Sequence, residues 1–314
     1  MTEHKLSPEA IKIISEIKLI SIDSIFENKM PGVLYGNRTV LEYYNFENEE
    51  RRILANTNDY IRGVHHDSKT KKTHYDGGNK HIICLENNSE QERQGLTLSI
   101  NCFNNLILDA GSYGLFNTET NEELISEKSL DDKKIDYIYS LDCFNNSLYA
   151  LVTNYDNSHS VVAINTSNPN NFSIEETIKK YKLKHTRICD FTIIPQKSFK
   201  GDNGKNYPFS IITCTYEQYL DLNKKKIKGT KIKNLPNQSI KRLKLIKSTN
   251  TTAEIIYSGQ NLNAIYKADI DLTNNTATTK KIITNLTDYV YALQPIFNKD
   301  SHKHLLELGE VIKK

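Results

Sequence analysis

The chain has 314 residues, of which 38% are hydrophobic and 25% are charged, and its formal net charge is +3. Its mean hydropathy is negative, and no stretch approaches the ~18 consecutive apolar residues that a membrane-spanning helix needs. Residues 1–10 lack the basic start and apolar core of a secretory signal. We therefore expect a cytoplasmic protein with no membrane association.

The first predicted element is a short helix over residues 8–18. Ser7 supplies an N-cap, Pro8 occupies the first turn, and three isoleucines between residues 13 and 17 follow at helical spacing. Residues 1–18 are therefore assigned to an N-terminal helical segment and residues 19–314 to one β domain.

Strands are predicted along most of the remaining chain. Short segments rich in Tyr, Ile, Val and Leu alternate with clusters of Asn, Asp, Gly and Ser, which is typical of an all-β fold. Residues 99–105 (SINCFNN) recur 41 positions later as residues 140–146 (SLDCFNN), with five of the seven positions identical. A period near 40 residues is that of one four-stranded blade, so the repeat predicts a single β-propeller.

The spacing of the predicted inner strands indicates the number of blades. Six segments open such strands, near residues 59–61, 96–98, 136–138, 188–190, 240–242 and 288–290. Little chain follows the last of them, whereas residues 33–36, 40–44 and 51–54 look like three strands without an inner partner. Joining the two ends completes a blade and removes open sheet edges. We expect six blades closed by both termini; the alternative is seven, if residues 19–22 begin a further blade.

Two shorter features complete the pattern. Residues 75–78 (YDGG) and 108–111 (LDAG) each follow a predicted inner strand, and their small residues suit a position where close packing or positive φ excludes larger side chains. At the C-terminal end, Leu305, Leu306 and Leu308 predict either a second short helix or an outer strand.

A family resemblance can be stated on residues 106–120 (LILDAGSYGLFNTET), which resemble the paired strands of repeat β-propellers of the WD type. The similarity extends over residues 58–165 and is one of pattern elsewhere. The chain contains no tryptophan, so it lacks the Trp-Asp dipeptide of those proteins. The resemblance implies a shared architecture and a scaffold or binding role, and it carries over no catalytic residue.

The five cysteines are expected to be reduced thiols, and Cys102, Cys143 and Cys189 are expected to fill inner strands as small apolar side chains. They include no Cys-x-x-Cys pair, and two of them occupy equivalent positions of the repeat. The set is Cys84, Cys102, Cys143, Cys189 and Cys214.

Candidate metal ligands cluster between residues 65 and 81. Neighbouring residues of a strand point to opposite faces, so His65 and His66 cannot share an ion, whereas His74 and Asp76 can. Lysines at positions 69, 71 and 72 would repel a cation there. We therefore expect a polar hairpin, with no metal and no cofactor.

Signatures of catalysis are absent from the sequence. It contains neither a Gly-x-Ser-x-Gly elbow nor a complete phosphate-binding loop. A non-catalytic protein is therefore favoured. The alternative is a hydrolase or lyase that acts at the channel mouth, where loops of several blades converge.

The charge distribution gives the main functional hypothesis. Residues 1–177 hold 16 Lys and Arg against 27 Asp and Glu, whereas residues 178–314 hold 25 against 11. We predict a non-catalytic scaffold whose basic half, residues 178–247, binds an acidic macromolecule, either RNA or DNA or an acidic protein; a solvated face is the alternative. Because Lys outnumbers Arg in this stretch, binding to nucleic acid would be directed to the backbone. The predicted binding residues are Lys224, Lys225, Lys226, Lys228, Lys231, Lys233, Lys241, Arg242, Lys244 and Lys247.

Overall fold

The computed structural model describes most of the chain beyond residue 29. The described residues are 30–78, 81–181, 188–195, 198–215, 220–222, 230–234, 240–259, 264–286, 290–308 and 310–311. The predicted helix over residues 8–18, the boundary at residue 18 and the segment 19–22 lie outside them.

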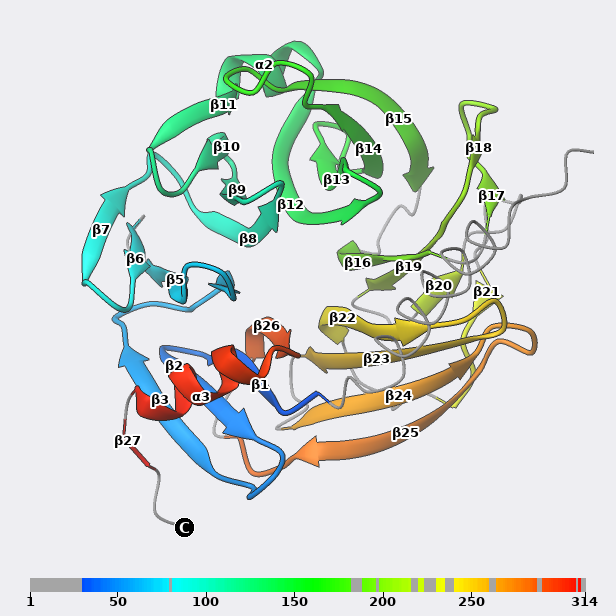
Figure 1. The fold of residues 1–314 in the computed structure, drawn as a ribbon. Helices are drawn as coiled ribbons and strands as arrows, with labels where there is room; N and C mark the ends of the chain where they lie inside the picture. Colours follow the sequence, from blue (N-terminus) through cyan, green and yellow to red (C-terminus); the bar gives the residue numbers. More distant parts are fainter. Residues whose placement is uncertain are drawn as a thin grey trace, which may run out of the picture.

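The described strands form antiparallel sheets arranged around a common centre (Figure 1). The first four-stranded sheet in chain order contains β4 (Val64–Asp67), β5 (Lys72–Gly78), β6 (His81–Cys84) and β7 (Ser89–Glu92). The second contains β8 (Thr97–Phe103), β9 (Leu106–Gly111), β10 (Gly114–Asn117) and β11 (Glu122–Ser126). The third contains β12 (Ile135–Phe144), β13 (Ser147–Asn154), β14 (His159–Asn165) and β15 (Ser173–Tyr181). Two more follow: β16 (Ile188–Ile194), β19 (Ser210–Thr215), β20 (Leu220–Leu222) and β21 (Thr230–Lys231); β22 (Ile240–Ser248), β23 (Thr252–Gly259), β24 (Ile265–Asp271) and β25 (Thr276–Ile283). A two-stranded ribbon, β17 (Phe199–Lys200) and β18 (Asn206–Tyr207), is inserted between β16 and β19.

The two ends of the described chain meet in one further sheet, whose strand order is β26-β1-β2-β3-β27. Its members are β26 (Val290–Ile296), β1 (Gly32–Asn37), β2 (Val40–Asn45), β3 (Arg51–Asn56) and β27 (Glu310–Val311). Gly32 pairs with Ile296 in the β1–β26 ladder, so the late strand β26 supplies the inner partner that the three early strands lack.

The inner strands contact one another in a closed order. β4 contacts β8, and the contacts continue through β12, β16, β22 and β26 back to β4. Apolar side chains fill the space between neighbouring sheets: Leu115, Leu141 and Val152 belong to one buried cluster, and Phe191 and Leu243 to the next. The all-β propeller architecture predicted from the repeat is thereby confirmed.

Among the described residues, two short helices lie outside the sheets. α2 (Glu127–Asp132) is a single helical segment between β11 and β12, which the sequence analysis did not predict. α3 (Lys299–Glu307) begins at the N-cap Asn298 and buries Leu305. Leu305 and Leu306 therefore belong to a helix and Leu308 is its C-cap, and an outer strand, β27, follows. Within the described residues, no helix combines the length and apolarity needed to cross a membrane.

One predicted inner strand begins later than expected. Residues 59–61 are not a strand, and the inner strand β4 begins at Val64. The backbone N–H groups of residues 60–62 are bound outside a ladder: Tyr60 N donates to Asp59 Oδ1 (2.6 Å), Ile61 N to the carbonyl of Arg38 (2.7 Å) and Arg62 N to Asp76 Oδ2 (3.3 Å). The segment leads into the sheet as a connection rather than as part of it.

The two Asp-small-Gly segments end the second strands β5 and β9. The carboxylate of Asp109 accepts two hydrogen bonds from Arg93 (2.8 and 2.6 Å) and one from Tyr113 Oη (2.7 Å). Asp76 similarly lies 3.6 Å from the Arg62 guanidinium. A Cβ on Gly111 would lie 1.9 Å from the Leu96 carbonyl oxygen, so only glycine fits there. The sequence predicted the need for small residues but not the role of the carboxylate.

Arg242 lies at the centre of the ring. Its five N–H groups donate to five backbone carbonyls, which belong to Tyr291 (2.6 Å), Cys189 (2.9 Å), Lys241 (3.3 Å), Arg62 (3.2 Å) and Leu98 (3.0 Å). The ring of Tyr139, on β12, lies 5.5 Å from the guanidinium carbon. Arg242 therefore contacts β8, β12, β16, β22 and β26 and the segment that leads into β4.

Replacing Arg242 with Met should destabilise the protein by at least about 3 kcal/mol, because five buried carbonyls would lose their donors. Urea unfolding of the variant and the wild type measures this difference. Arg52→Met is the matched control: its ion pair with Glu50 is partly exposed, and its loss should cost less than about 1 kcal/mol. Equal losses in the two variants would contradict a central role for Arg242.

Candidate binding site at the mouth of the central channel

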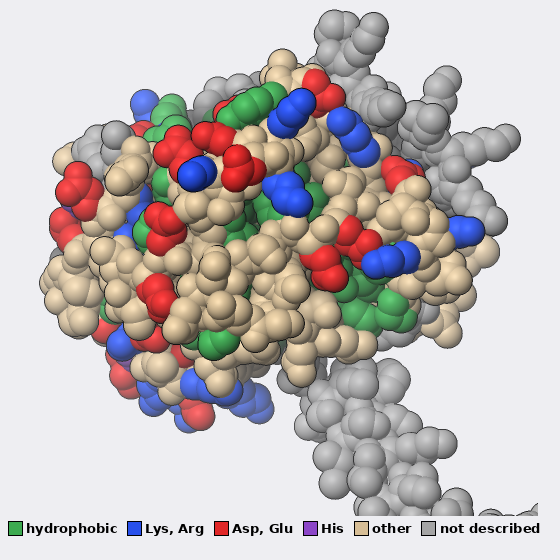
Figure 2. Space-filling model, turned by 90° about the horizontal axis from the view of Figure 1, so that it is seen from above, with side chains coloured by type: hydrophobic (Ala, Val, Ile, Leu, Met, Phe, Trp, Pro, Cys, Tyr) green, Lys and Arg blue, Asp and Glu red, His purple; other side chains and the backbone are tan. Residues whose placement is uncertain are grey.

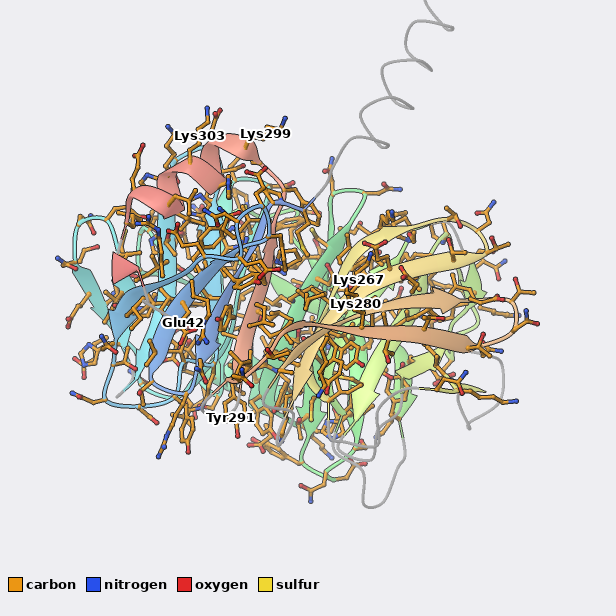
Figure 3. All side chains as sticks on the ribbon, turned by 90° about the horizontal axis from the view of Figure 1, so that it is seen from below. Glu42, Lys267, Lys280, Tyr291, Lys299 and Lys303 are labelled. Atoms are coloured by element: carbon orange, nitrogen blue, oxygen red, sulfur yellow. The ribbon has the colours of Figure 1, made fainter. Side chains whose placement is uncertain are left out.

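A cavity of about 270 Å³ opens at one end of the ring, and every inner strand contributes to its lining. Arg242 binds carbonyls near the starts of β8, β16 and β26, whereas the cavity is lined by residues that follow along the same strands, such as Asn101, Ile193 and Pro295. The cavity therefore lies beyond Arg242 along the channel. Figure 3 shows Tyr291 at the opposite face from α3, which follows the end of β26.

Asn101 and Asp142, which occupy the same position of the repeat, tie neighbouring inner strands together beside the cavity. Asn101 Nδ2 donates to the carbonyl of Leu141 (2.8 Å). Asp142 Oδ2 accepts from Thr192 Oγ1 (3.0 Å) and from Ile193 N (2.9 Å), and its Oδ1 accepts from Cys143 N (2.8 Å). Burial raises the pKa of Asp142, and the charge of Lys244 opposes this shift. Both Asp142 oxygens are thus occupied by donors of the chain itself.

Lys244 and His65 present hydrogen-bond donors in the cavity. No ion pair involving Lys244 occurs among the described residues. Burial lowers the pKa of His65 to about 3, so its ring is neutral. Gln294 Nε2 donates to its Nδ1 (3.4 Å), which leaves the ring proton on Nε2. The cavity therefore contains one ammonium group and one neutral N–H donor between apolar walls.

The cysteines at the two repeat positions are less buried than predicted. Cys143 is exposed at the cavity and Cys102 is half-buried, whereas Cys84, Cys189 and Cys214 are buried. Positions 102 and 143 come at the ends of inner strands, just before a turn, so the prediction of apolar filling was wrong there. Partial desolvation and, secondarily, the Asp142 carboxylate raise the pKa of Cys143 to about 11.

The predicted basic residues that the structure describes differ in burial and pairing. Lys241 and Arg242 are buried, with exposed fractions of 3% and 7%, so their assignment to a binding surface was wrong. Lys247 pairs with Glu254 (3.2 Å), Lys233 is exposed, and Lys244 lines the cavity. Lys224, Lys225, Lys226 and Lys228 lie outside the described residues, as does the side chain of Lys231.

Other lysines of the basic half are paired with carboxylates. Lys179 lies 3.1 Å from Asp202 and Lys180 lies 3.0 Å from Asp156. On the face drawn in Figure 2, Lys and Arg side chains lie among Asp and Glu side chains. A count of charges along the chain therefore overstates the charge that a partner would meet.

The predicted metal-capable pair is not assembled. Asp76 accepts from Arg62 N and from Gly78 N (3.1 Å), and burial raises its pKa to about 6. His74 is buried, which lowers its pKa. In the described part of the chain, no group of three or more His, Cys, Asp or Glu side chains is arranged to hold a metal ion.

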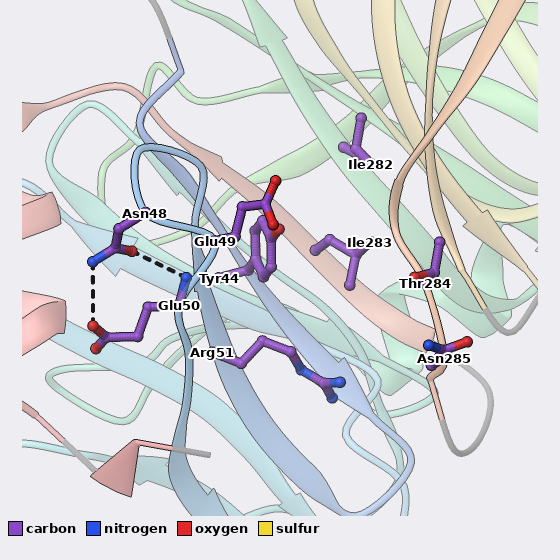
Figure 4. Close-up of a pocket in the computed structure, with 9 residues that line it drawn as sticks. All are labelled: Tyr44, Asn48, Glu49, Glu50, Arg51, Ile282, Ile283, Thr284 and Asn285. Carbon is purple, nitrogen blue, oxygen red and sulfur yellow. Dashed lines mark hydrogen bonds between the residues drawn. The ribbon is translucent and has the colours of Figure 1, made fainter. Parts of the chain in front are cut away.

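A larger cavity of about 760 Å³ lies between the β2–β3 turn and the end of β25 (Figure 4). Tyr44 stands beside Glu49 there and faces Ile283. Its one cationic side chain, Arg51, is held by Glu42 through two hydrogen bonds (3.2 and 2.6 Å). The channel mouth is the better candidate site because its polar groups converge from all the inner strands and include a cation without such a partner.

Comparisons with known proteins assign no family to the chain. No family model matches the chain, and no curated protein matches it. Among solved structures, the chain is similar to the crystal structure of the WD40 beta propeller domain of Doa1, with a TM-score of 0.33 and 9% identity; the match covers 83% of this chain and 68% of that one. The propeller assignment rests on the strand order of the chain itself.

The thiol of Cys143 should be reachable by reagents but slow to react at neutral pH. Its raised pKa, about 11, means that alkylation by iodoacetamide should accelerate about tenfold per pH unit as the pH rises toward that value. Mass spectrometry of digested protein measures labelling at each cysteine, with buried Cys189 as the internal control. Full labelling of Cys143 within the same time at pH 7 and at pH 9 would contradict the raised pKa.

Proposed function

We propose that the protein is a non-catalytic cytoplasmic scaffold that binds an acidic macromolecule, either an acidic protein or RNA or DNA. The observation that carries the proposal is Lys244, a half-buried ammonium group that lines the open channel mouth together with a neutral His65 and has no ion pair among the described residues. In this proposal residues 1–18 form a separate segment and residues 19–314 form the propeller domain.

The ring is proposed to have six blades. The sheet that joins the two ends of the chain takes the place of the last blade, because its strand β26 contacts both β22 and β4. Its remaining strands, β1, β2 and β3, follow outward in the same order as in the four-stranded sheets.

An acidic side chain of a protein partner fits the channel mouth best. Since Asp142 is already satisfied by three donors, the charge of Lys244 is available to an anionic group that enters. The walls include Ile100, Leu245 and Phe297, which suit an aliphatic stem and would not contact a hydrated phosphate backbone favourably. Binding of nucleic acid would instead depend on the lysines between residues 224 and 233.

The chemistry of Cys143 favours binding over nucleophilic catalysis. A thiol with a pKa of about 11 is protonated at neutral pH and is a weak nucleophile. A hydrolase or lyase at the channel mouth would need a base in contact with it, and the hydrogen bond that His65 makes is with Gln294.

Substitution of Lys244 by Met should weaken binding of a fluorescently labelled hexaglutamate peptide about tenfold or more, because a charge-assisted hydrogen bond is lost. Fluorescence anisotropy at low salt measures the affinity. Lys280→Met removes the same charge from an exposed position on β25 and is the matched control, which should change affinity less than about twofold.

A single-stranded RNA oligonucleotide serves as the second probe. If RNA is the partner, binding should fall steeply with salt, and replacing Lys224, Lys225, Lys226 and Lys228 with Ser should weaken it while Lys244→Met does not. Retention of neither probe at low salt, or equal effects of Lys244→Met and Lys280→Met on the peptide, would overturn the proposed function.

A further inference from the structure

Gln294 lies on the inner strand β26, between the two strands that carry the donors of the channel mouth. β26 contacts β22, which carries Lys244, and it also contacts β4, which carries His65. Gln294 and His65 line both the channel-mouth cavity and an adjoining groove of about 340 Å³. The strand that separates His65 from Lys244 therefore supplies a side chain that binds His65.

The hydrogen bonds of Gln294 fix the orientation of its amide group. A backbone N–H can only donate, so the bond from His66 N (2.6 Å) identifies the accepting atom as Oε1. Nε2 then donates to the carbonyl of His66 (3.2 Å) and to Nδ1 of His65 (3.4 Å). Turning the amide over would set donor against donor and acceptor against acceptor at His66, so the orientation is held from both sides.

This orientation decides which nitrogen of His65 carries the hydrogen. Nδ1 accepts from Gln294, so the neutral ring has its hydrogen on Nε2. His65 is half-buried, and the buried unpaired atoms of the described residues do not include its Nε2. The surface that His65 exposes lies in the cavity and the groove that it lines, so Nε2–H is an accessible donor there.

Lys244 supplies a second donor within electrostatic range of the first. Burial is the largest cause of the lowered pKa of His65, and the positive charge of Lys244 is a smaller one. Lys244 is half-buried, and its ammonium group has no hydrogen bond or ion pair among the described residues. The two donors together carry one positive charge, because the ring of His65 is neutral.

We propose that one carboxylate of the acidic partner bridges Lys244 Nζ and His65 Nε2–H, and that Gln294 is the positioning residue that presents the second donor. A carboxylate has two acceptor oxygens, one for each donor, and a single charge that matches the ammonium group. A phosphoryl group carries close to two negative charges, and Asp142, which lines the same cavity, would repel it more strongly. This inference rests on the proposed function, since it names the group of the acidic partner that the site holds.

The orientation of Gln294 has a spectroscopic signature. In protein labelled with 15N-histidine, the long-range 1H–15N spectrum of the ligand-free wild type should show His65 with its hydrogen on Nε2. In Gln294→Met, which has no donor for Nδ1, His65 should show a mixture of both tautomers. Gln91→Met, on the outer strand β7, is the matched control and should leave the His65 spectrum unchanged. A wild-type His65 with its hydrogen on Nδ1 would overturn the assignment.

Binding is measured by NMR titration with acetyl-Ala-Ala-Glu-Ala-Ala-amide and with its glutamine and phosphoserine counterparts. The wild type should bind the glutamate peptide about tenfold or more tightly than the glutamine peptide, because charge-assisted hydrogen bonds are lost. His65→Leu should weaken binding of the glutamate peptide about fivefold or more. His65→Gln retains an N–H donor and should stay within about threefold of the wild type. Tighter binding of the phosphoserine peptide would overturn the choice of a carboxylate.

The outcomes separate this proposal from the proposed function. If the glutamate peptide depends on Lys244 but binds His65→Leu as tightly as the wild type, the bridging carboxylate is wrong and the acidic-partner proposal stands. If no acidic peptide binds, the proposed function fails, and sodium acetate against sodium chloride at equal concentration then decides the bridge. A shift of the His65 Nε2–H resonance with acetate alone would support it, and the absence of that shift would overturn it.

Discussion

The guanidinium of Arg242 is the interaction on which the ring depends. It is a single planar group, and it contacts every inner strand or the segment that leads into it, through five carbonyls and the ring of Tyr139. Four of these carbonyls lie on inner strands and the fifth, that of Arg62, lies in the segment that leads into β4, so the channel is where they find a donor. Arg242 can donate to all five carbonyls only when all the sheets are in place. These hydrogen bonds therefore stabilise the closed arrangement of the ring.

The position of Arg242 also determines where a ligand can bind. Arg242 and Lys244 are two residues apart on β22, so both point into the channel, while Leu243 between them packs between sheets. The guanidinium of Arg242 is occupied by backbone carbonyls, whereas the ammonium group of Lys244 faces the cavity beyond Arg242. Asp142, the one acid that lines this cavity, is bound to neighbouring strands. One strand thus supplies both the structural and the available positive charge.

The sequence predicted the architecture well because it depends on repetition. The repeat at residues 99–105 and 140–146 marks equivalent ends of β8 and β12, and the unpaired early strands found their partner in β26. The site was predicted poorly, because charge was counted along the chain without asking which side of β22 faces the channel. Side chains alternate between the two sides of a strand, and Leu243 is buried between sheets. This alternation was the signal that Arg242 and Lys244 face the channel and do not belong to an exposed run of basic residues. Cys143 and the start of β4 were misjudged because turns and carboxylate contacts, not hydrophobicity, decide them.

Part of the positive charge that the structure describes in the second half of the chain is paired with carboxylates. Lys179, Lys180 and Lys247 each have a carboxylate within ion-pair distance, and such partly exposed pairs cancel at the range over which a partner approaches. Lys244 differs from these lysines, because it is half-buried beside apolar lining residues and has no carboxylate within ion-pair distance among the described residues. Under the proposed function, recognition would therefore depend on the few unpaired polar groups at the channel mouth more than on net charge, and the partner would be selected by its side chains.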